Sequence, residues 1–253
     1  MEEAGCNLKL ADLLKSKREI RKVTIDEKKA LREGEKIGHE VWDIYYEKVR
    51  DYNVSFSETL SFFEFNSFRD ILAQRKLNNL TTNILDLMGG DGSFLRDLQS
   101  TGRRHKILDS GLCITLVDER KEKLKAKDEE NNIEVECGDI TSKKTWRTID
   151  RWQENNGVKN FDLVVCRGVG GLETNIIPES TYPYIFSRVW ERLSDKNGLF
   201  VSQLHSMANE ETILKLLSKV AGAKFHFQRS RSGFTEFDGI KNRLPALGIV
   251  KTL

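Results

Sequence analysis

The feature that most constrains the fold is a regular alternation of short apolar runs with helical stretches, which begins at Asn83. The apolar runs have the length of strands and lie at residues 83–88, 112–117, 133–137, 161–166 and 198–204. The stretches between them predict helices near residues 92–100, 119–128, 143–155, 181–194 and 208–221. Apolar strands that alternate with helices are typical of a parallel sheet covered on both faces. We therefore predict an α/β fold with a doubly wound sheet.

The last two apolar segments predict a different arrangement. Residues 224–229 alternate polar and apolar side chains, and residues 246–251 are again mostly apolar. Only a polar loop without a helix-length segment separates them, whereas parallel neighbours need a long crossover connection. We therefore expect a mostly parallel seven-stranded sheet that ends in an antiparallel C-terminal strand pair.

The first 79 residues are predicted to be helical and to form a cap or lid over a domain of residues 80–253. Apolar residues recur at helical spacing between residues 37 and 49, and Ser57 is placed to cap a helix that runs to about Lys76. Upstream, Thr24 and Glu27 form a capping-box pattern at the start of an earlier helix.

Composition excludes several classes of protein. The 41 basic and 39 acidic residues give a net charge of +2, which argues against nucleic acid as a partner. The four cysteines are widely spaced, so neither a metal site nor a disulfide framework is expected. No apolar run approaches the roughly 18 residues of a membrane span, and the N-terminus lacks a signal-peptide pattern. The expected setting is cytoplasmic, with no membrane association; the pattern leaves the oligomeric state open.

A glycine-rich turn is the strongest functional signal. The first predicted strand contains Asp86 and leads through Gly89, Gly90 and Gly92 into a helix. Glycines let the backbone approach a ligand closely, and ligands of open α/β sheets bind at the carboxyl ends of the strands. The alternative is a tight turn without a ligand. A dinucleotide fingerprint does not fit, because Leu95 stands where that pattern needs a small residue.

This turn resembles the first motif of the class I S-adenosylmethionine (SAM)-dependent methyltransferases, an acid followed by G-x-G-x-G. Asp86 matches the acid, Gly90 and Gly92 match the second and third glycines, and Met88 occupies the first place with Gly89 beside it. The resemblance implies a Rossmann-like fold, SAM as the cofactor and methyl transfer as the activity. At Met88 a side chain replaces the glycine of the motif, so the distance between the backbone and the cofactor at this position is not predicted by the motif.

Three further segments resemble the same family in the same order. Asp118 follows the second strand, where the family's acid binds the ribose hydroxyls. The third strand leads into Asp139 and Ile140, which resemble the loop that binds the adenine amino group and packs on the ring. The fourth strand, FDLVVC, ends at Cys166, which would face the methionine part of the cofactor.

The catalytic residues are less constrained, because methyl transfer needs mainly alignment, exclusion of water and sometimes a base. The candidates follow the fourth and fifth strands and are Arg167, Glu173, Tyr182, Tyr184 and His205. His205, Glu173 and Arg167 are preferred: a histidine titrates near neutral pH, and an arginine binds carboxylate or phosphate groups. Local hydrogen bonding of His205 and an Arg167–Glu173 ion pair are the alternatives.

The aromatic residues suggest where an acceptor binds. Nine of the 22 aromatic residues lie between residues 42 and 68. Tyr45, Tyr46 and Tyr52 are the candidates for a substrate-lining set, whereas the alternative is that the aromatic rings dock helices on the sheet. The expected acceptor is a small molecule methylated at O or N. The alternatives are a peptide, protein or RNA methyltransferase, or a catalytically silent binding subunit.

Overall fold

The computed structural model describes residues 49–100, 107–115, 131–166, 181–204, 210–218, 220, 222–229, 231–232, 242–243 and 245–252. Outside these ranges lie the helix predicted to start at the Thr24–Glu27 capping box, most of the helix predicted between residues 37 and 49, and the helix predicted near residues 119–128. Within the described ranges, no helix is long and apolar enough to span a membrane.

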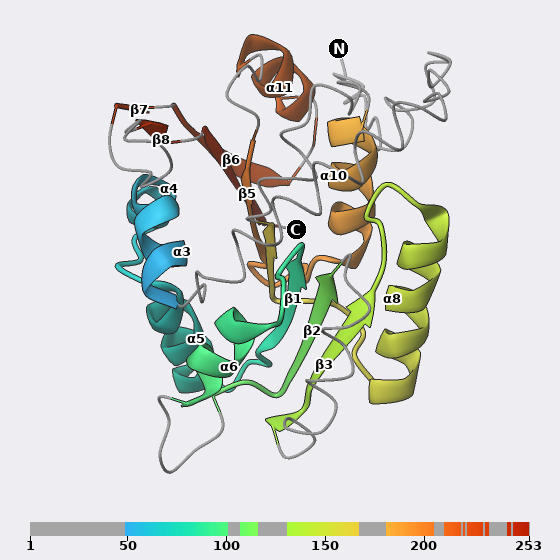
Figure 1. Cartoon of the computed structure of the whole chain (residues 1–253). Helices are drawn as coiled ribbons and strands as arrows, with labels where there is room; N and C mark the ends of the chain where they lie inside the picture. The colour runs from blue at the N-terminus through green and yellow to red at the C-terminus, as the bar shows by residue number, and fades with distance from the viewer. Residues whose placement is uncertain are drawn as a thin grey trace, which may run out of the picture.

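The central element is a seven-stranded sheet in the order β3-β2-β1-β4-β5-β9-β6 (Figure 1). Its first five strands are parallel: β1 (Asn83–Leu87), β2 (Ser110–Thr115), β3 (Ile133–Cys137), β4 (Leu163–Cys166) and β5 (Leu199–Gln203). β9 (Ala246–Lys251) lies antiparallel between β5 and β6 (Ala223–Gln228). The predicted doubly wound sheet and its antiparallel C-terminal pair are therefore confirmed.

A small ribbon was not foreseen from the sequence. β7 (Arg231–Ser232) pairs antiparallel with β8 (Asn242–Arg243), within the connection between β6 and β9. The connection that appeared to be only a polar loop therefore contains a second, two-stranded sheet.

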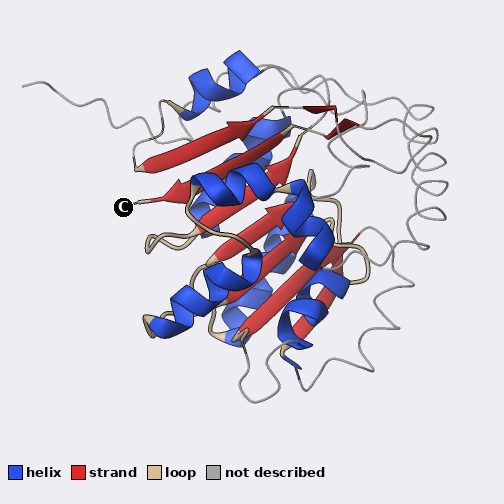
Figure 2. Cartoon of the chain, turned by 90° about the vertical axis from the view of Figure 1, so that its left-hand side faces the viewer, coloured by secondary structure: helices blue, strands red, loops and turns tan. Residues whose placement is uncertain are grey.

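Helices cover both faces of the main sheet (Figures 1 and 2). One layer, which faces the viewer in Figure 2, contains α3 (Val49–Ser55), α4 (Ser57–Phe62), α5 (Phe68–Leu77) and α6 (Ser93–Ser100). The opposite layer contains α8 (Lys143–Asn156), α10 (Thr181–Arg192) and α11 (Glu210–Leu217). The helices predicted near 92–100, 143–155, 181–194 and 208–221 are thus confirmed, with shorter ends in three of the four.

Each face of the sheet has its own hydrophobic core, because successive side chains of a strand point to opposite faces. In β1, Ile84 belongs to the core under α3–α6, whereas Leu85 and Leu87 belong to the core under α8, α10 and α11. All five β1 residues are buried, as expected for a central parallel strand.

The helix predicted from Ser57 to about Lys76 is wrong in one respect: it is two helices. α4 ends at Phe62, Glu64 has a positive φ of 67°, and α5 begins at Phe68. The cause is a capping arrangement at Ser67, whose side chain accepts a hydrogen bond from the backbone N–H of Asp70. The Asp70 carboxylate in turn accepts from the backbone N–H of Asn66. These two bonds fix a new helix start in the middle of the apolar pattern.

Residues 49–77 pack as part of the α/β domain. Phe56, Leu60 and Leu72 are fully buried in the same core as Ile84 of β1. The domain boundary expected at residue 80 therefore does not coincide with any division of this core. The cap or lid of residues 1–79 stays a prediction, because residues 1–48 lie outside the described ranges.

Candidate functional site

The turn between β1 and α6 lies at the carboxyl edge of the parallel strands, where sequence analysis placed the cofactor. It is held to the sheet by the Gly89 N–H, which donates to the carbonyl of Ile114 at 3.2 Å. The turn closes on itself through the Gly92 N–H, which donates to the carbonyl of Gly89 at 3.0 Å. The turn therefore has a defined backbone conformation that is anchored on β2.

The backbone of the turn has a left-handed conformation at alternate positions. Met88, Gly90 and Gly92 have positive φ angles of 64°, 60° and 78°. These are the three positions that match the glycines of the G-x-G-x-G motif. Met88 keeps the conformation although a side chain disfavours it by about 1–2 kcal/mol. Met88 thus differs from a glycine in its side chain but shares the left-handed backbone of Gly90 and Gly92.

Gly89 leaves room for the carboxylate of Asp86. A Cβ atom placed on Gly89 would overlap both the carboxyl carbon and Oδ2 of Asp86. The Asp86 side chain is completely buried and belongs to the same face of β1 as Ile84. The absence of a side chain at residue 89 is therefore what allows an acid to lie directly beneath the turn.

A tyrosine of α3 contacts this acid and stacks on a phenylalanine of α6. Tyr52 of α3 is completely buried and stacks on Phe94 of α6, with ring centroids 3.9 Å apart and an interplanar angle of 9°. Its hydroxyl donates to Oδ1 of Asp86 at 3.4 Å. The position differs from the predicted one, because Tyr52 has no exposed surface to offer a substrate. For this residue the alternative role, docking a helix, describes the structure.

Cys113 of β2 backs the turn from the sheet. Its thiol is fully buried and lies 3.8 Å from the carbonyl oxygen of Gly90. Burial, and then the negative charges of Asp86 and Asp91, raise the pKa of the Cys113 thiol well above its usual range. Cys113 therefore remains a neutral thiol and packs as a small apolar residue.

Asp91 is a part of the site that sequence analysis missed. Its carboxylate accepts from the backbone N–H of Ser93 at 2.9 Å and pairs with Arg96 at 2.9 Å. One of the free N–H groups at the start of α6 is thus already satisfied. The signal was present in the sequence, since an Asp in a turn commonly accepts a hydrogen bond from the backbone N–H two residues further on.

The loop after β3 holds two predicted cofactor residues in different environments. Asp139 is exposed, and its Oδ1 accepts hydrogen bonds from the backbone N–H and hydroxyl of Thr141 at 2.8 and 2.7 Å. Ile140 is only 2% exposed, and its carbonyl accepts from the Trp146 indole N–H at 2.8 Å. Asp139 therefore keeps accessible surface for a ligand, whereas Ile140 offers little area to an adenine ring.

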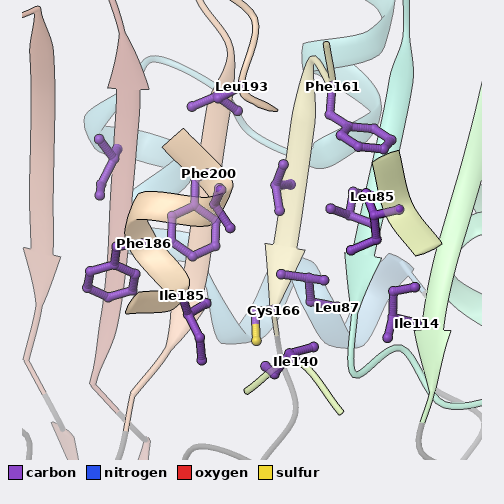
Figure 3. Packing of buried hydrophobic residues seen from close by; sticks show 14 of the residues in the cluster. Leu85, Leu87, Ile114, Ile140, Phe161, Cys166, Ile185, Phe186, Leu193 and Phe200 are labelled. Carbon is purple, nitrogen blue, oxygen red and sulfur yellow. The ribbon is translucent and has the colours of Figure 1, made fainter. Parts of the chain in front are cut away.

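Cys166 ends β4 at the same edge and is completely buried. Figure 3 shows its sulfur near the tip of the β4 arrow, next to Ile140 and below Leu87, within the core that also contains Ile185. β1 and β4 are neighbours, with Leu87 opposite Cys166. The structure thus brings the predicted residues of β1, the β3 loop and β4 together along one edge of the sheet.

The remaining predicted residues lie outside the described part of the chain. They are Asp118, Arg167, Glu173, His205, Tyr45 and Tyr46, and their roles stay predictions. Tyr184 is described in α10, where its ring contacts the guanidinium of Arg188 at 5.3 Å from the centroid. Among the residues that the structure describes, no cluster of His, Cys, Asp or Glu is arranged to hold a metal ion.

No protein-family model matches this sequence, and no curated protein matches it. One similar solved structure is that of the plantazolicin methyltransferase BamL in complex with a triazolic desmethylPZN analogue and SAH. It is 15% identical to this chain, with a TM-score of 0.47, and the match covers 79% of this chain and 94% of that chain. A SAM-dependent methyltransferase from Clostridium acetobutylicum is 15% identical over 73% of this chain and 90% of that one, with a TM-score of 0.44.

A third solved structure, a putative RNA methyltransferase from Pyrococcus horikoshii, is 15% identical over 73% of this chain and 82% of that one, with a TM-score of 0.43. Similarities of this size say nothing about the substrate of this chain. Its fold is therefore judged from its own sheet. The strand order, the antiparallel β9 and the turn after β1 agree with the fold that the resemblance to the class I SAM-dependent methyltransferases implies.

Proposed function

We propose that the protein is a SAM-dependent methyltransferase that transfers a methyl group to O or N of a small molecule by in-line displacement. The observation that carries the proposal is the turn after β1. Its three positive-φ positions coincide with the glycine places of the SAM-binding motif, and its buried acid lies beneath a glycine that has no room for a Cβ.

The residues present fit the cofactor. Gly89 leaves room for the acid of the motif, and Asp139 holds an exposed carboxylate after β3, which is two strands away from β1 in the sheet. A carboxylate accepts hydrogen bonds from hydroxyl and amino groups, which are the donors that the ribose and adenine offer. In this proposal Asp86, Gly90 and Gly92 shape the methionine side of the site, while Asp118 and Asp139 bind the nucleoside side.

When bound, SAM supplies a methyl group on a positively charged sulfonium centre. The protein has to place the acceptor in line with that methyl group and keep water away from it. Cys166 at the end of β4 is completely buried, so it packs in the core beneath this edge and offers no exposed surface of its own. His205, Glu173 and Arg167 are proposed to bind the acceptor or remove its proton.

The small-molecule acceptor is supported by the charge balance. A net charge of +2 over 253 residues provides no strong field for a polyanion. Tyr45 and Tyr46 are proposed to line the acceptor pocket. Replacing both by Phe should raise the KM for the acceptor and leave cofactor binding unchanged; unaltered kinetics would remove them from the site.

Calorimetric titration of the intact protein with SAM and with its demethylated product S-adenosylhomocysteine (SAH) tests the proposal. Binding of both is expected, and no heat of binding at about 1 mM ligand would overturn the proposed function. Asp118→Ala should lose most of the affinity, because the ribose hydroxyls lose their acceptor. Unreduced affinity would show that Asp118 is not at the cofactor.

A pair of glycine substitutions tests the turn itself. Gly89→Ala should weaken SAH binding about tenfold or more, since the added Cβ displaces the Asp86 carboxylate. The matched control is Gly157→Ala at the end of α8, where the φ of 64° costs about 1–2 kcal/mol of stability but no atom lies within 4 Å of the added Cβ. Equal SAH affinity in the two variants would remove the turn from the binding site.

A further inference from the structure

Tyr52 lies at the contact between the first helix that the structure describes and the turn proposed to hold the cofactor. The sequence separation from Asp86 is 34 residues, so nothing local brings the two together. α3 reaches the turn because Tyr52 packs between α5 and α6, stacked on Phe94 and edge-on to Phe68 at 6.4 Å. The ring therefore fixes the position of its own hydroxyl.

The hydroxyl is the part of Tyr52 that packing alone does not explain. A phenylalanine would fill the same space and make the same ring contacts. A buried hydroxyl without a partner costs about 1–3 kcal/mol, so its presence in a fully buried side chain requires an acceptor. Oδ1 of Asp86 is such an acceptor at 3.4 Å.

The acid itself is confined on its other side by the turn. Oδ2 of Asp86 lies where a Cβ of Gly89 would be, so any rotation of the carboxylate changes its contact with the turn. The Gly89 N–H and carbonyl are both used, one toward Ile114 and the other by Gly92. A group that fixes the carboxylate therefore also limits the conformations open to the turn.

We propose that Tyr52 is a positioning residue for the cofactor site, whose hydroxyl orients the Asp86 carboxylate beneath the turn. The inference deepens the proposed function and rests on it. It moves Tyr52 from the acceptor side to the cofactor side of the site. It also makes α3 a structural part of cofactor binding, since the helix carries the donor that reaches β1.

The first experiment compares SAH affinity by calorimetry in wild type, Tyr52→Phe, Asp86→Asn and the double variant. Tyr52→Phe keeps the ring and removes only the hydroxyl, and it should weaken SAH binding by about threefold to tenfold. In the Asp86→Asn background the same substitution should have a smaller effect, because the two groups act as a unit. An equal effect in both backgrounds, or wild-type affinity in Tyr52→Phe, would overturn the inference.

Thr59→Val is the matched control. The Thr59 hydroxyl is also fully buried and donates to Oε1 of Gln228 at the same 3.4 Å, but it contacts β6 instead of the turn. The control should lose a similar amount of thermal stability and keep wild-type SAH affinity. A loss of affinity in Thr59→Val as large as that in Tyr52→Phe would show that the effect is general destabilisation.

The second experiment needs no cofactor and therefore separates this inference from the proposed function. In ligand-free protein, hydrogen exchange at the Gly89 and Gly92 amides should be about threefold to tenfold faster in Tyr52→Phe than in Thr59→Val. Equal exchange would overturn the positioning role. If wild type binds no SAH, the proposed function fails, whatever the exchange rates show.

Discussion

Removing the Arg75 side chain should destabilise the protein far more than removing its neighbour on the same helix. Arg75 of α5 and Asp162, just before β4, form an ion pair whose side chains are 7% and 2% exposed. Arg75 also donates to the carbonyls of Thr81 at 2.7 Å and Lys196 at 3.1 Å. Asp162 also accepts from the backbone N–H of Asn83 at 2.9 Å. The pair thus connects a helix, two strand starts and a loop.

The magnitude follows from what each variant leaves behind. Arg75→Met keeps most of the volume but leaves a buried carboxylate without its cation, which costs about 3–5 kcal/mol. The double variant Arg75→Met/Asp162→Asn removes both charges, and the amide oxygen can still accept from Asn83. Its cost should therefore be well below that of Arg75→Met alone. Lys76→Met, which breaks a pair with Asp109 at 36% and 43% exposure, should cost about 1 kcal/mol or less.

The assay is urea unfolding of the full chain followed by circular dichroism, with the free energy of unfolding extrapolated to water for each variant. If the free energies of unfolding of Arg75→Met and Lys76→Met lie within about 1 kcal/mol of each other, the reasoning is refuted, because burial of the ion pair would then have no effect. A double variant at least as unstable as Arg75→Met would also refute it, because the unpaired carboxylate would then not be the cause.

The pH dependence gives a second check. Burial raises the pKa of Asp162, against the opposing effects of the Asn83 N–H and of Arg75. Removing Arg75 should raise this pKa further. A folded-state pKa above the unfolded value means that the folded protein takes up the proton more readily, so the cost of Arg75→Met should shrink as pH falls through that raised pKa. A cost that grows on acidification would contradict the assignment.

Three further predictions concern single contacts. Burial lowers the pKa of His226, and the charge of Glu58 opposes this shift, so stability should fall as pH drops below about 6.5. His226→Phe should flatten this part of the pH profile of the free energy of unfolding. An unchanged profile would show that His226 is not the cause. Lys251→Met should cost about 1–3 kcal/mol in urea unfolding, because its ammonium donates to the carbonyls of Trp190 and Leu193 at the end of α10. Ser67→Ala should cost about 1 kcal/mol by removing the cap of α5, whereas Ser61→Ala in α4 serves as the uncapped comparison; equal losses would argue against the cap.

The strands were predictable because their signal is local. β3 and β9 begin and end where the apolar pattern does, and the other strands of the main sheet differ from their predicted ends by one or two residues. The interruption between α4 and α5 was missed for a related reason. Phe63 and Phe68 continue the apolar spacing across the break, so the periodicity masks the capping bonds of Ser67. Where a strong pattern and a capping signal overlap, the cap determines the helix boundary.

The cofactor turn was predictable from its residue types, but its supporting contacts were not. Gly90 and Gly92 predict a left-handed backbone, because glycine adopts it readily. Met88 has the same conformation against its own preference, in a turn that Gly89 anchors on Ile114 of β2. The role of Gly89 depends on where the Asp86 side chain points. The spacing of residues in the sequence does not predict the direction of the Asp86 side chain, because that direction follows from the pairing of β1 with β2 and β4.

The register of β1 is therefore as important to the site as the motif. β1 pairs with β2 and β4 so that Ile84 and Asp86 face α3–α6, while Leu85 and Leu87 face the opposite helices. A shift of one residue would turn every β1 side chain to the other face. Asp86 would then lose its contact with the Tyr52 hydroxyl, and a leucine would lie beneath the turn instead. The aromatic residues of α3, α5 and α6 thus do more than bury surface. They pack in the same core as Ile84, and Tyr52 among them donates to Asp86, so they favour the register in which the acid lies under Gly89.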